Sequence, residues 1–373
     1  MQYSPLSLVK HRVEVGAPLP FNVRHADHTL LLARGQVIES HEQLAVLFAR
    51  GALVDLAELT TADVIDMAQP KELPRLWKRC LAQLSDSLRH AGEVGFHEAL
   101  DAATPPVLAL VARDKDLAIF QVLRQDNQAF VQYGIEHASH AAICAWLVAQ
   151  RLGWSGAESQ RVFKAALTMN VAMLELQGQL AEQTSPPTPE QRAAIHAHPE
   201  AGRALLELSG VTDTDWLRAV AQHHEHHDGS GYPQGLREVN DLAALVRRAD
   251  IYTAKLSPRK RREAIAADQA GRMMFMQDAG HPMTAALVKE FGVYPPGCWV
   301  KLANGESGVV VRRGAKVMAP IVAVFISPAG ATLREPERRD TSHPSHAVHS
   351  VLGAQRRKLP VAPDVLVAMS AAA

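Results

Sequence analysis

Cysteine is scarce in this sequence, whose 373 residues include only Cys80, Cys144 and Cys298. Three widely spaced cysteines argue against a disulfide framework and against zinc sites built from cysteine, and they fit a reducing cytoplasm. Net charge is also lacking, because 39 basic side chains balance 39 acidic ones. This balance argues against a nucleic-acid polymer as the partner.

Long hydrophobic runs are lacking too. The longest, near 319–326, is much too short to span a membrane. The N-terminus has the basic residues Lys10 and Arg12 but no apolar run of the kind found in signal peptides. We therefore expect a cytoplasmic protein without a membrane partner, and the length predicts about two to three domains.

Histidine, in contrast, is abundant. The sequence has 18 histidines, and eight of them fall between His137 and His227. Histidine is the commonest metal ligand in proteins, so this cluster suggests a metal-dependent function.

The N-terminal part, residues 1–70, predicts a small β-rich unit. Residues 21–32 indicate two strands around a polar turn, and residues 42–50 indicate a short helix. Residues 71–132 carry apolar side chains at helical spacing and predict a helical connector.

Residues 133–291 predict a longer, mainly helical domain. Gly153 follows Leu152 as a helix-ending residue, and Thr188 to Gln191 form a capping box that begins another helix.

Beyond residue 291 the pattern changes to strands. Strands at 298–302 and 307–312 flank Asn304-Gly305, which predicts a hairpin with a type I′ turn. We assign residues 292–335 to a small β module and residues 336–373, rich in Pro, Ser, His and Ala, to a flexible tail. The expected fold class is thus multidomain α+β.

The densest chemical signal lies at 223–233, His-His-Glu-His-His-Asp-Gly-Ser-Gly-Tyr-Pro. An amphipathic helix leads into it, and the glycine-rich run ends that helix. Neighbouring helical residues are about 100° apart, so both His223 and His224 can reach one ion only at a helix end. By itself, this run fits a metal site and a solvated polar helix end equally well.

This region resembles the HD-GYP family of metal-dependent phosphodiesterases that hydrolyse cyclic di-GMP. Residues 223–233 match the family's His-His-Glu-x-x-Asp-Gly-x-Gly-Tyr-Pro element, and 198–202 match its His-Pro-x-x-Gly element. His137 stands sixteen residues before Gly153, where the family has a helix-opening histidine, and Asp250 matches its last aspartate ligand.

The resemblance implies roles for particular residues. It implies metal ligands at His198, His223 and His224, and further ligands at His137 and Asp250. It implies a nucleotide-side loop and basic groups directed at phosphates, at Gly231, Tyr232, Pro233, Arg259 and Arg262. Arginine suits phosphate because its planar fork of donors matches two oxygens. Without this resemblance, the charge run at 259–262 would be typical of a solvated surface.

One element departs from the family. Where the family usually has Leu-His-Asp-Ile-Gly-Lys, residues 168–173 read Thr-Met-Asn-Val-Ala-Met. Met169 and Asn170 therefore replace the His-Asp pair, and Met173 replaces the lysine. In the family the aspartate bridges two metal ions, which need an anion between them at about 3.5–4 Å. A neutral amide cannot replace that anion, so a two-metal hydrolase is not expected.

Three functions stay open. The leading hypothesis is a bacterial-type signalling protein, impaired or silent as an enzyme, that binds cyclic di-GMP, another small nucleotide or a signalling protein. The alternative is a phosphodiesterase with a single Fe, Mn or Zn ion held by three histidines. The third is a scaffold, for instance a homodimer. A metal-free centre is equally open.

Overall fold

A computed structural model describes residues 3–55, 58, 61–124, 132–353 and 361–371. They belong to two compact units, Met1–Gln83 with Ala102–Arg113 and Leu84–Asp101 with Asp114–Ala373. The predicted multidomain α+β class is confirmed by a helical region and two separate antiparallel sheets. The boundaries predicted at residues 70, 132 and 291 stay predictions.

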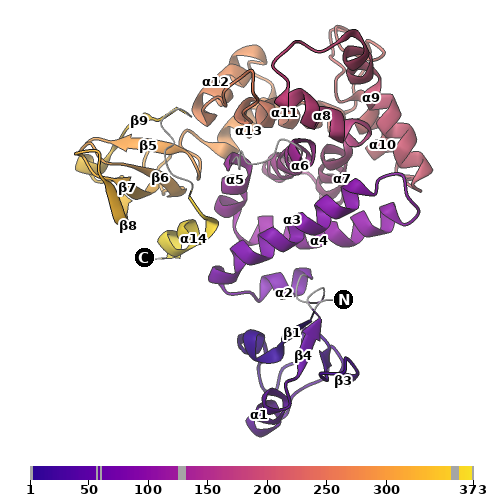
Figure 1. Cartoon of the computed structure of the whole chain (residues 1–373). Coiled ribbons are helices and arrows are strands. Elements are labelled where there is room, and N and C mark those ends of the chain that lie inside the picture. The colour runs from indigo at the N-terminus through magenta and orange to yellow at the C-terminus, as the bar shows by residue number, and fades with distance from the viewer. Residues whose placement is uncertain (1–2, 56–57, 59–60, 125–131, 354–360, 372–373) are drawn as a thin grey trace. The chain divides into compact units, whose positions relative to one another are not determined.

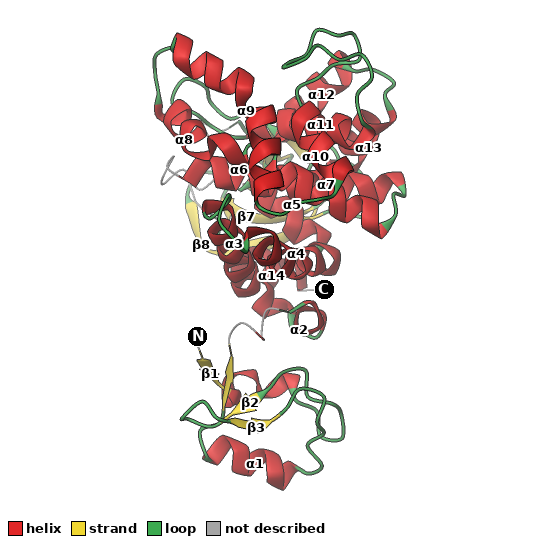
Figure 2. Ribbon diagram, turned by 90° about the vertical axis from the view of Figure 1, so that its right-hand side faces the viewer, coloured by secondary structure: helices red, strands yellow, loops and turns green. Residues whose placement is uncertain are grey.

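The first unit contains a small sheet with strand order β1-β4-β2-β3. Its hydrophobic core includes Phe21, Val23 and Val54, together with Leu47 from α1, which lies beside the sheet (Figure 2). The predicted strand pair and short helix are confirmed as β2–β3 and α1. The elements are β1 (Tyr3–Pro5), η1 (Leu6–Arg12), β2 (Val23–Arg24), β3 (Leu30–Leu32), α1 (His41–Ala49), β4 (Leu53–Asp55), α2 (Ala62–Asp66) and η3 (Pro70–Glu72). Helices α3 (Leu73–Arg89) and α4 (Phe96–Arg113) contribute residues to both units.

The second unit is built around α6 (Tyr133–Leu152), which is buried over most of its length because small and apolar side chains cover all its faces. It packs against α5, α7, α8, α11 and α13 (Figure 1). The surrounding helices are α5 (Lys115–Leu123), α7 (Gly156–Thr168), η5 (Val171–Met173), α8 (Leu174–Glu182), α9 (Pro189–Leu208), α10 (Thr214–Gln222), α11 (Asp241–Leu256), α12 (Ala267–Gln277) and α13 (Pro282–Phe291). Within the described ranges, no helix is both long enough and apolar enough to cross a membrane.

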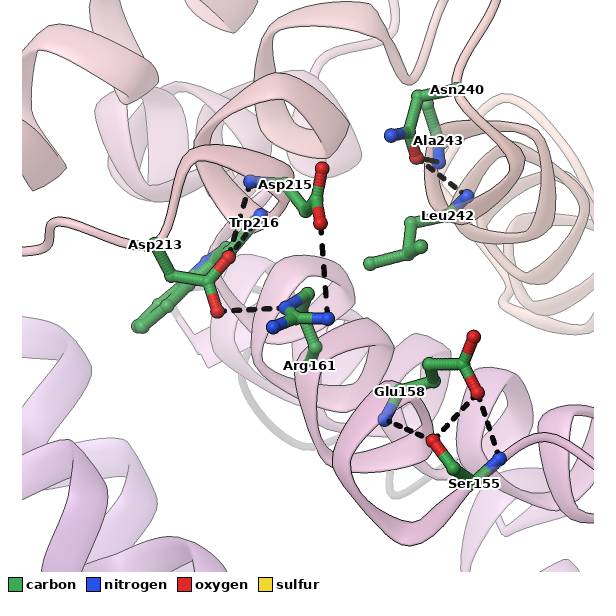
Figure 3. A network of polar contacts seen from close by, with 9 residues as sticks. All are labelled: Ser155, Glu158, Arg161, Asp213, Asp215, Trp216, Asn240, Leu242 and Ala243. Atoms are coloured by element: carbon green, nitrogen blue, oxygen red, sulfur yellow. Dashed lines mark hydrogen bonds and ion pairs between the residues drawn. The ribbon is translucent and has the colours of Figure 1, made fainter.

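Side-chain caps fix where these helices begin and end. Thr188 forms the predicted capping box of α9, and Gly153 ends α6 with φ 78°. Asp213 caps α10 by accepting from the backbone N–H of Trp216 at 3.0 Å. The same carboxylate accepts from Arg161 Nε of α7 at 2.7 Å, as Figure 3 shows. One carboxylate therefore starts α10 and ties it to α7.

A five-stranded antiparallel sheet follows α13, in the order β8-β7-β6-β5-β9. Helix α14 packs on β6, β7 and α5, and Arg313 pairs with Asp116 at the start of α5. The elements are β5 (Trp299–Leu302), β6 (Ser307–Arg312), β7 (Ile321–Ile326), β8 (Thr332–Asp340), η6 (Pro344–His346), β9 (Val348–Val351) and α14 (Pro363–Ala371).

The flexible tail predicted at 336–373 differs from the structure for its described residues, because the end of β8, the whole of β9 and α14 lie within it. Strands β8 and β9 are the two edges of the sheet, so polar side chains suit them. Arg339 of β8 also pairs with Glu306 through two hydrogen bonds of 2.8 and 2.9 Å. Polar composition therefore marked edge strands rather than disorder.

The hairpin between β5 and β6 is present, but its turn is not type I′. That turn requires positive φ at both central residues, and only Gly305 has it, at 90°. The N–H of Gly305 bonds to the carbonyl of Leu302, as in a type I turn followed by a left-handed glycine.

Replacing Asp213 with Ala should destabilise the second unit, because α10 loses its cap and Arg161 loses its partner. We expect a loss of about 1–2 kcal/mol, or a fall in melting temperature of about 2–8 °C, measured by circular dichroism. Asp215→Ala is the control, since its ion pair with Arg161 is longer, at 3.8 Å, and its side chain is 45% exposed. Equal effects for the two variants would contradict the capping role.

Candidate metal centre

Three histidines from two helices converge beside α11. His198 belongs to α9, while His223 and His224 follow the last residue of α10. Their ligand atoms all lie within 4.8 Å of one another. We call His198, His223 and His224 the three-histidine cluster.

The end of α10 explains how two adjacent histidines reach one point. His223 is the C-cap of α10, and the chain turns at His224 before entering the loop. The prediction that the pair requires a helix terminus is confirmed. His198 reaches the same point from the middle of α9, where its side chain is buried.

Backbone carbonyls fix the orientation of two of these rings. His198 Nδ1 lies 2.5 Å from the carbonyl oxygen of Ile195, and His223 Nδ1 lies 2.7 Å from that of Val220. A carbonyl only accepts, so each Nδ1 carries the hydrogen and each neutral ring keeps a lone pair on Nε2. Carbonyl contacts of this kind orient metal-ligating histidines.

The two Nε2 atoms face each other at 3.1 Å. Burial lowers the pKa of His198 to about 3, with a further contribution from His223, and burial also lowers the pKa of His223 and of His224. The rings are therefore neutral near pH 7, and two lone pairs at this distance repel unless a cation lies between them. The donor set fits one Zn²⁺, Fe²⁺ or Mn²⁺ ion.

His137 and Asp250 form a separate pair next to the cluster. His137 Nε2 lies 2.7 Å from Asp250 Oδ1, and both side chains are largely buried. Burial alone would raise the pKa of Asp250, but the hydrogen bond and the charge of His137, with His224 and His223 nearby, hold it below its usual range. These two residues, which the resemblance implies as further ligands, thus contact each other directly.

Met169 and Asn170 are both buried, with exposed fractions of 0% and 2%. The thioether of Met169 is a soft ligand and carries no charge, and Asn170 Oδ1 is buried without a hydrogen-bond partner. No described cluster of metal-ligating side chains other than the three-histidine cluster was found. The described residues therefore supply one group of three metal-ligating side chains.

The loop after the cluster packs tightly against it. The Tyr232 ring stacks on His224 with centroids 4.5 Å apart and on His196 with centroids 5.1 Å apart. A Cβ on Gly231 would lie 2.5 Å from backbone atoms of Glu225 and His226. Only glycine fits there, so the Gly-Tyr-Pro sequence has a direct packing cause.

Glu225 is a site residue to which sequence reasoning assigned no role. It is 1% exposed, and its carboxylate accepts from the backbone N–H groups of Gln234, Gly235 and Leu236 at 2.7 to 3.2 Å. A buried carboxylate with three donors holds the loop firmly against the cluster. Its position inside the matched motif was the only available signal.

Arg259 is linked to the His137–Asp250 pair through Tyr133. Its Nε donates to the hydroxyl of Tyr133 at 2.9 Å, and Tyr133 stacks on His137. Arg262 is exposed and donates to the carbonyl oxygen of Ala254. The phosphate roles of both arginines stay predictions.

Replacing Gly231 with Ala should displace the loop and release the metal. A Cβ at this position meets backbone, which cannot move aside cheaply. We expect metal content, measured by elemental analysis, to fall at least severalfold and the melting temperature to drop. Gly156→Ala is the control, because a Cβ there meets nothing within 4 Å. Full metal content in Gly231→Ala would refute this packing argument.

His140, one turn beyond His137, should make the metal-free protein sensitive to acid. Burial first, and then His137, lower its pKa to about 3 from an ordinary value of 6.5. Below pH 6.5 only the unfolded chain takes up this proton, so stability falls as the pH drops, by about 2 kcal/mol at pH 5. His140→Gln should therefore lose about 4–8 °C less in melting temperature between pH 7.5 and pH 5. The exposed His349→Gln should behave like the parent. If the melting temperature of His140→Gln fell as much as that of the parent between pH 7.5 and pH 5, His140 would not be the cause of the acid sensitivity.

The comparison with known proteins matches the region that contains the three-histidine cluster. Residues 121–281 match the HD domain family. The chain is 29% identical over 195 residues to a cyclic di-GMP phosphodiesterase of Pseudomonas aeruginosa, covering 50% of this chain and 47% of that protein. It is 31% identical over 146 residues to the cyclic di-GMP phosphodiesterase response regulator RpfG of Xanthomonas campestris, covering 38% of each.

This chain contains an HD domain of the HD-GYP family. A 3′3′-cGAMP-specific phosphodiesterase of Vibrio cholerae is 26% identical over 144 residues, covering 38% of this chain and 31% of that protein. The chain spans less than half the length of these three relatives. Among solved structures, the HDG"Y"P protein Bd1817 from Bdellovibrio bacteriovorus has a TM-score of 0.48 and 16% identity, covering 77% of this chain and 98% of its own.

The HD-GYP assignment agrees with the resemblance that the motifs indicated. The family is metal-dependent, and the three-histidine cluster of this chain could hold a metal ion. The replacement of the family's His-Asp pair by Met169 and Asn170 stays a prediction from the sequence.

Proposed function

We propose that this protein binds a cyclic dinucleotide at a centre with one divalent metal ion and hydrolyses it poorly or not at all. The observation that carries the proposal is that Met169 and Asn170 are buried and uncharged, while His198, His223 and His224 converge in the three-histidine cluster. Ligand recognition and hydrolysis use different residues, so one can persist without the other.

The replacement of the His-Asp pair by Met169 and Asn170 removes groups needed for attack on the phosphate. It leaves the residues that we propose to bind the ligand. Two divalent cations repel each other strongly unless an anion lies between them, and Asn170 is neutral. When bound, a single ion would polarise a phosphate oxygen. His198, His223 and His224 would hold that ion, and Asp250 lies close enough to influence their charge.

The substrates of the relatives support the ligand class. Their names include cyclic di-GMP and 3′3′-cGAMP, both of which are cyclic dinucleotides. In this chain the Tyr232 loop is fixed to His224, and Arg259 lies beside the His137–Asp250 pair. We favour cyclic di-GMP and place the protein in the cytoplasm, where three free, buried cysteines stay reduced.

A second candidate is a slow phosphodiesterase with a single metal ion. The facing Nε2 atoms favour it, because they form a nitrogen site that a metal-bound water could complete. The chain could instead bind a signalling protein or a second copy of itself. Titration with cyclic di-GMP distinguishes these partners from a nucleotide.

The purified full chain should contain close to one first-row transition metal and should bind cyclic di-GMP. Elemental analysis and titration calorimetry measure these two properties on the same preparation. His223→Ala should lose the metal, because it removes one of three ligands, whereas the exposed His349→Ala should keep it. Linear dinucleotide product, measured by chromatography, should stay at background with Zn²⁺, Fe²⁺ or Mn²⁺.

Hydrolysis by the metal-loaded protein that disappears in His224→Ala would overturn the impaired centre and favour the second candidate. If the reconstituted protein held no metal and bound no nucleotide, only the scaffold function would remain. Met169→His combined with Asn170→Asp is the complementary variant, since any gain of activity would show that only these ligands were missing.

A further inference from the structure

Arg247 of α11 is a half-buried arginine without an assigned role. Its Nε is buried and has no hydrogen-bond partner, and its guanidinium forms no ion pair with any described residue. Burial lowers the pKa of this group, as does the charge of the neighbouring Arg248. A buried cation without an acceptor costs folding free energy.

The nearby carboxylates are engaged with other groups. Asp278 Oδ2 accepts from Arg248 Nε at 2.8 Å, from Arg248 Nη2 at 2.5 Å and from Thr284 at 2.7 Å. Asp228 Oδ1 accepts from the N–H and the hydroxyl of Ser230 at 2.9 and 2.6 Å. Both carboxylates favour a charged Arg247 through space, but neither bonds to it.

Arg247 stands on the same side of α11 as Asp250. The two are three residues apart, hence neighbours on the helix surface. Both are partly exposed, as is Ala254 one turn further, whereas the intervening Arg248 and Ala249 are buried. Position 247 therefore lies one turn before Asp250 on the partly exposed face of α11, and the charge of Asp250 acts on His223 and His224.

Basic groups lie at both ends of this face. Arg262 donates to the carbonyl oxygen of Ala254, and a backbone bridge joins it to Arg259. Residues 247 and 254 are about 10 Å apart along the helix. At the other end, the partly exposed Arg247 precedes Asp250 by one helical turn.

We propose that Arg247 binds a phosphate group of the cyclic dinucleotide, on the side of the metal centre opposite Arg259. A cyclic dinucleotide carries two phosphodiester groups, each with one negative charge, so two separate guanidinium groups match its charge distribution. Arginine donates two parallel hydrogen bonds to phosphate oxygens. This inference rests on the proposed function, since it names a further contact of the same ligand.

Arg247→Met tests the inference, because methionine keeps much of the apolar stem and removes the charge. Titration calorimetry of the full chain with cyclic di-GMP should show an affinity about 10- to 100-fold lower, as for a lost charge-assisted hydrogen bond. Metal content should stay the same, and the melting temperature should stay equal or rise, because an unpaired buried charge is gone. Arg247→Lys should retain part of the affinity, and the exposed Arg218→Met should retain all of it.

Two results would overturn the inference. Parent-like affinity in Arg247→Met would show that the guanidinium does not contact the ligand. A lower melting temperature with loss of metal would show that Arg247 supports the fold instead. If the parent chain itself fails to bind cyclic di-GMP, both the proposed function and this inference fail, whereas parent binding with an unaffected variant refutes the inference alone.

Discussion

The structure of this centre depends on one constraint: three neutral imidazoles are held close together in a buried place. Backbone carbonyls of Ile195 and Val220 take the Nδ1 hydrogens of His198 and His223, so both Nε2 lone pairs point inward and face each other at 3.1 Å. Such an arrangement is stable around a cation and unfavourable without one. The end of α10 and the loop that follows it both serve this convergence.

Charge distinguishes this centre from a two-metal hydrolase. A pair of divalent ions needs several carboxylates, and here Asp250, whose charge acts on His223 and His224, is already bonded to His137. Guanidinium groups at both ends of the partly exposed face of α11 instead favour an anion. In the function proposed above, the neutral amide of Asn170 and the guanidinium of Arg247 act in the same direction, because both suit a phosphate ligand better than a second metal ion.

Sequence reasoning succeeded where a local rule decides the outcome. Capping at Thr188, the left-handed Gly153 and the helix end at His223 follow from the residues themselves. It failed where partners far apart in the sequence decide. The polar composition after residue 335 suggested a tail, but hydrogen bonds to β7 and the ion pair of Arg339 with Glu306 make part of it an edge strand. Glu225 had no assigned role because its three donors come from residues 234–236, and their approach depends on the loop.

The sequence by itself determined which ligand types are present and which are missing: the histidines at 198, 223 and 224, the glycine at 231, and the replacement of the His-Asp pair by Met169 and Asn170. Residue chemistry is local, so the identity of a side chain suffices for such statements. Only the tertiary structure decided that the two Nε2 atoms face each other, that His137 bonds to Asp250, and that the buried Nε of Arg247 has no acceptor among the described residues. These properties depend on distances between helices, because side-chain packing across α6, α9, α10 and α11 fixes those distances.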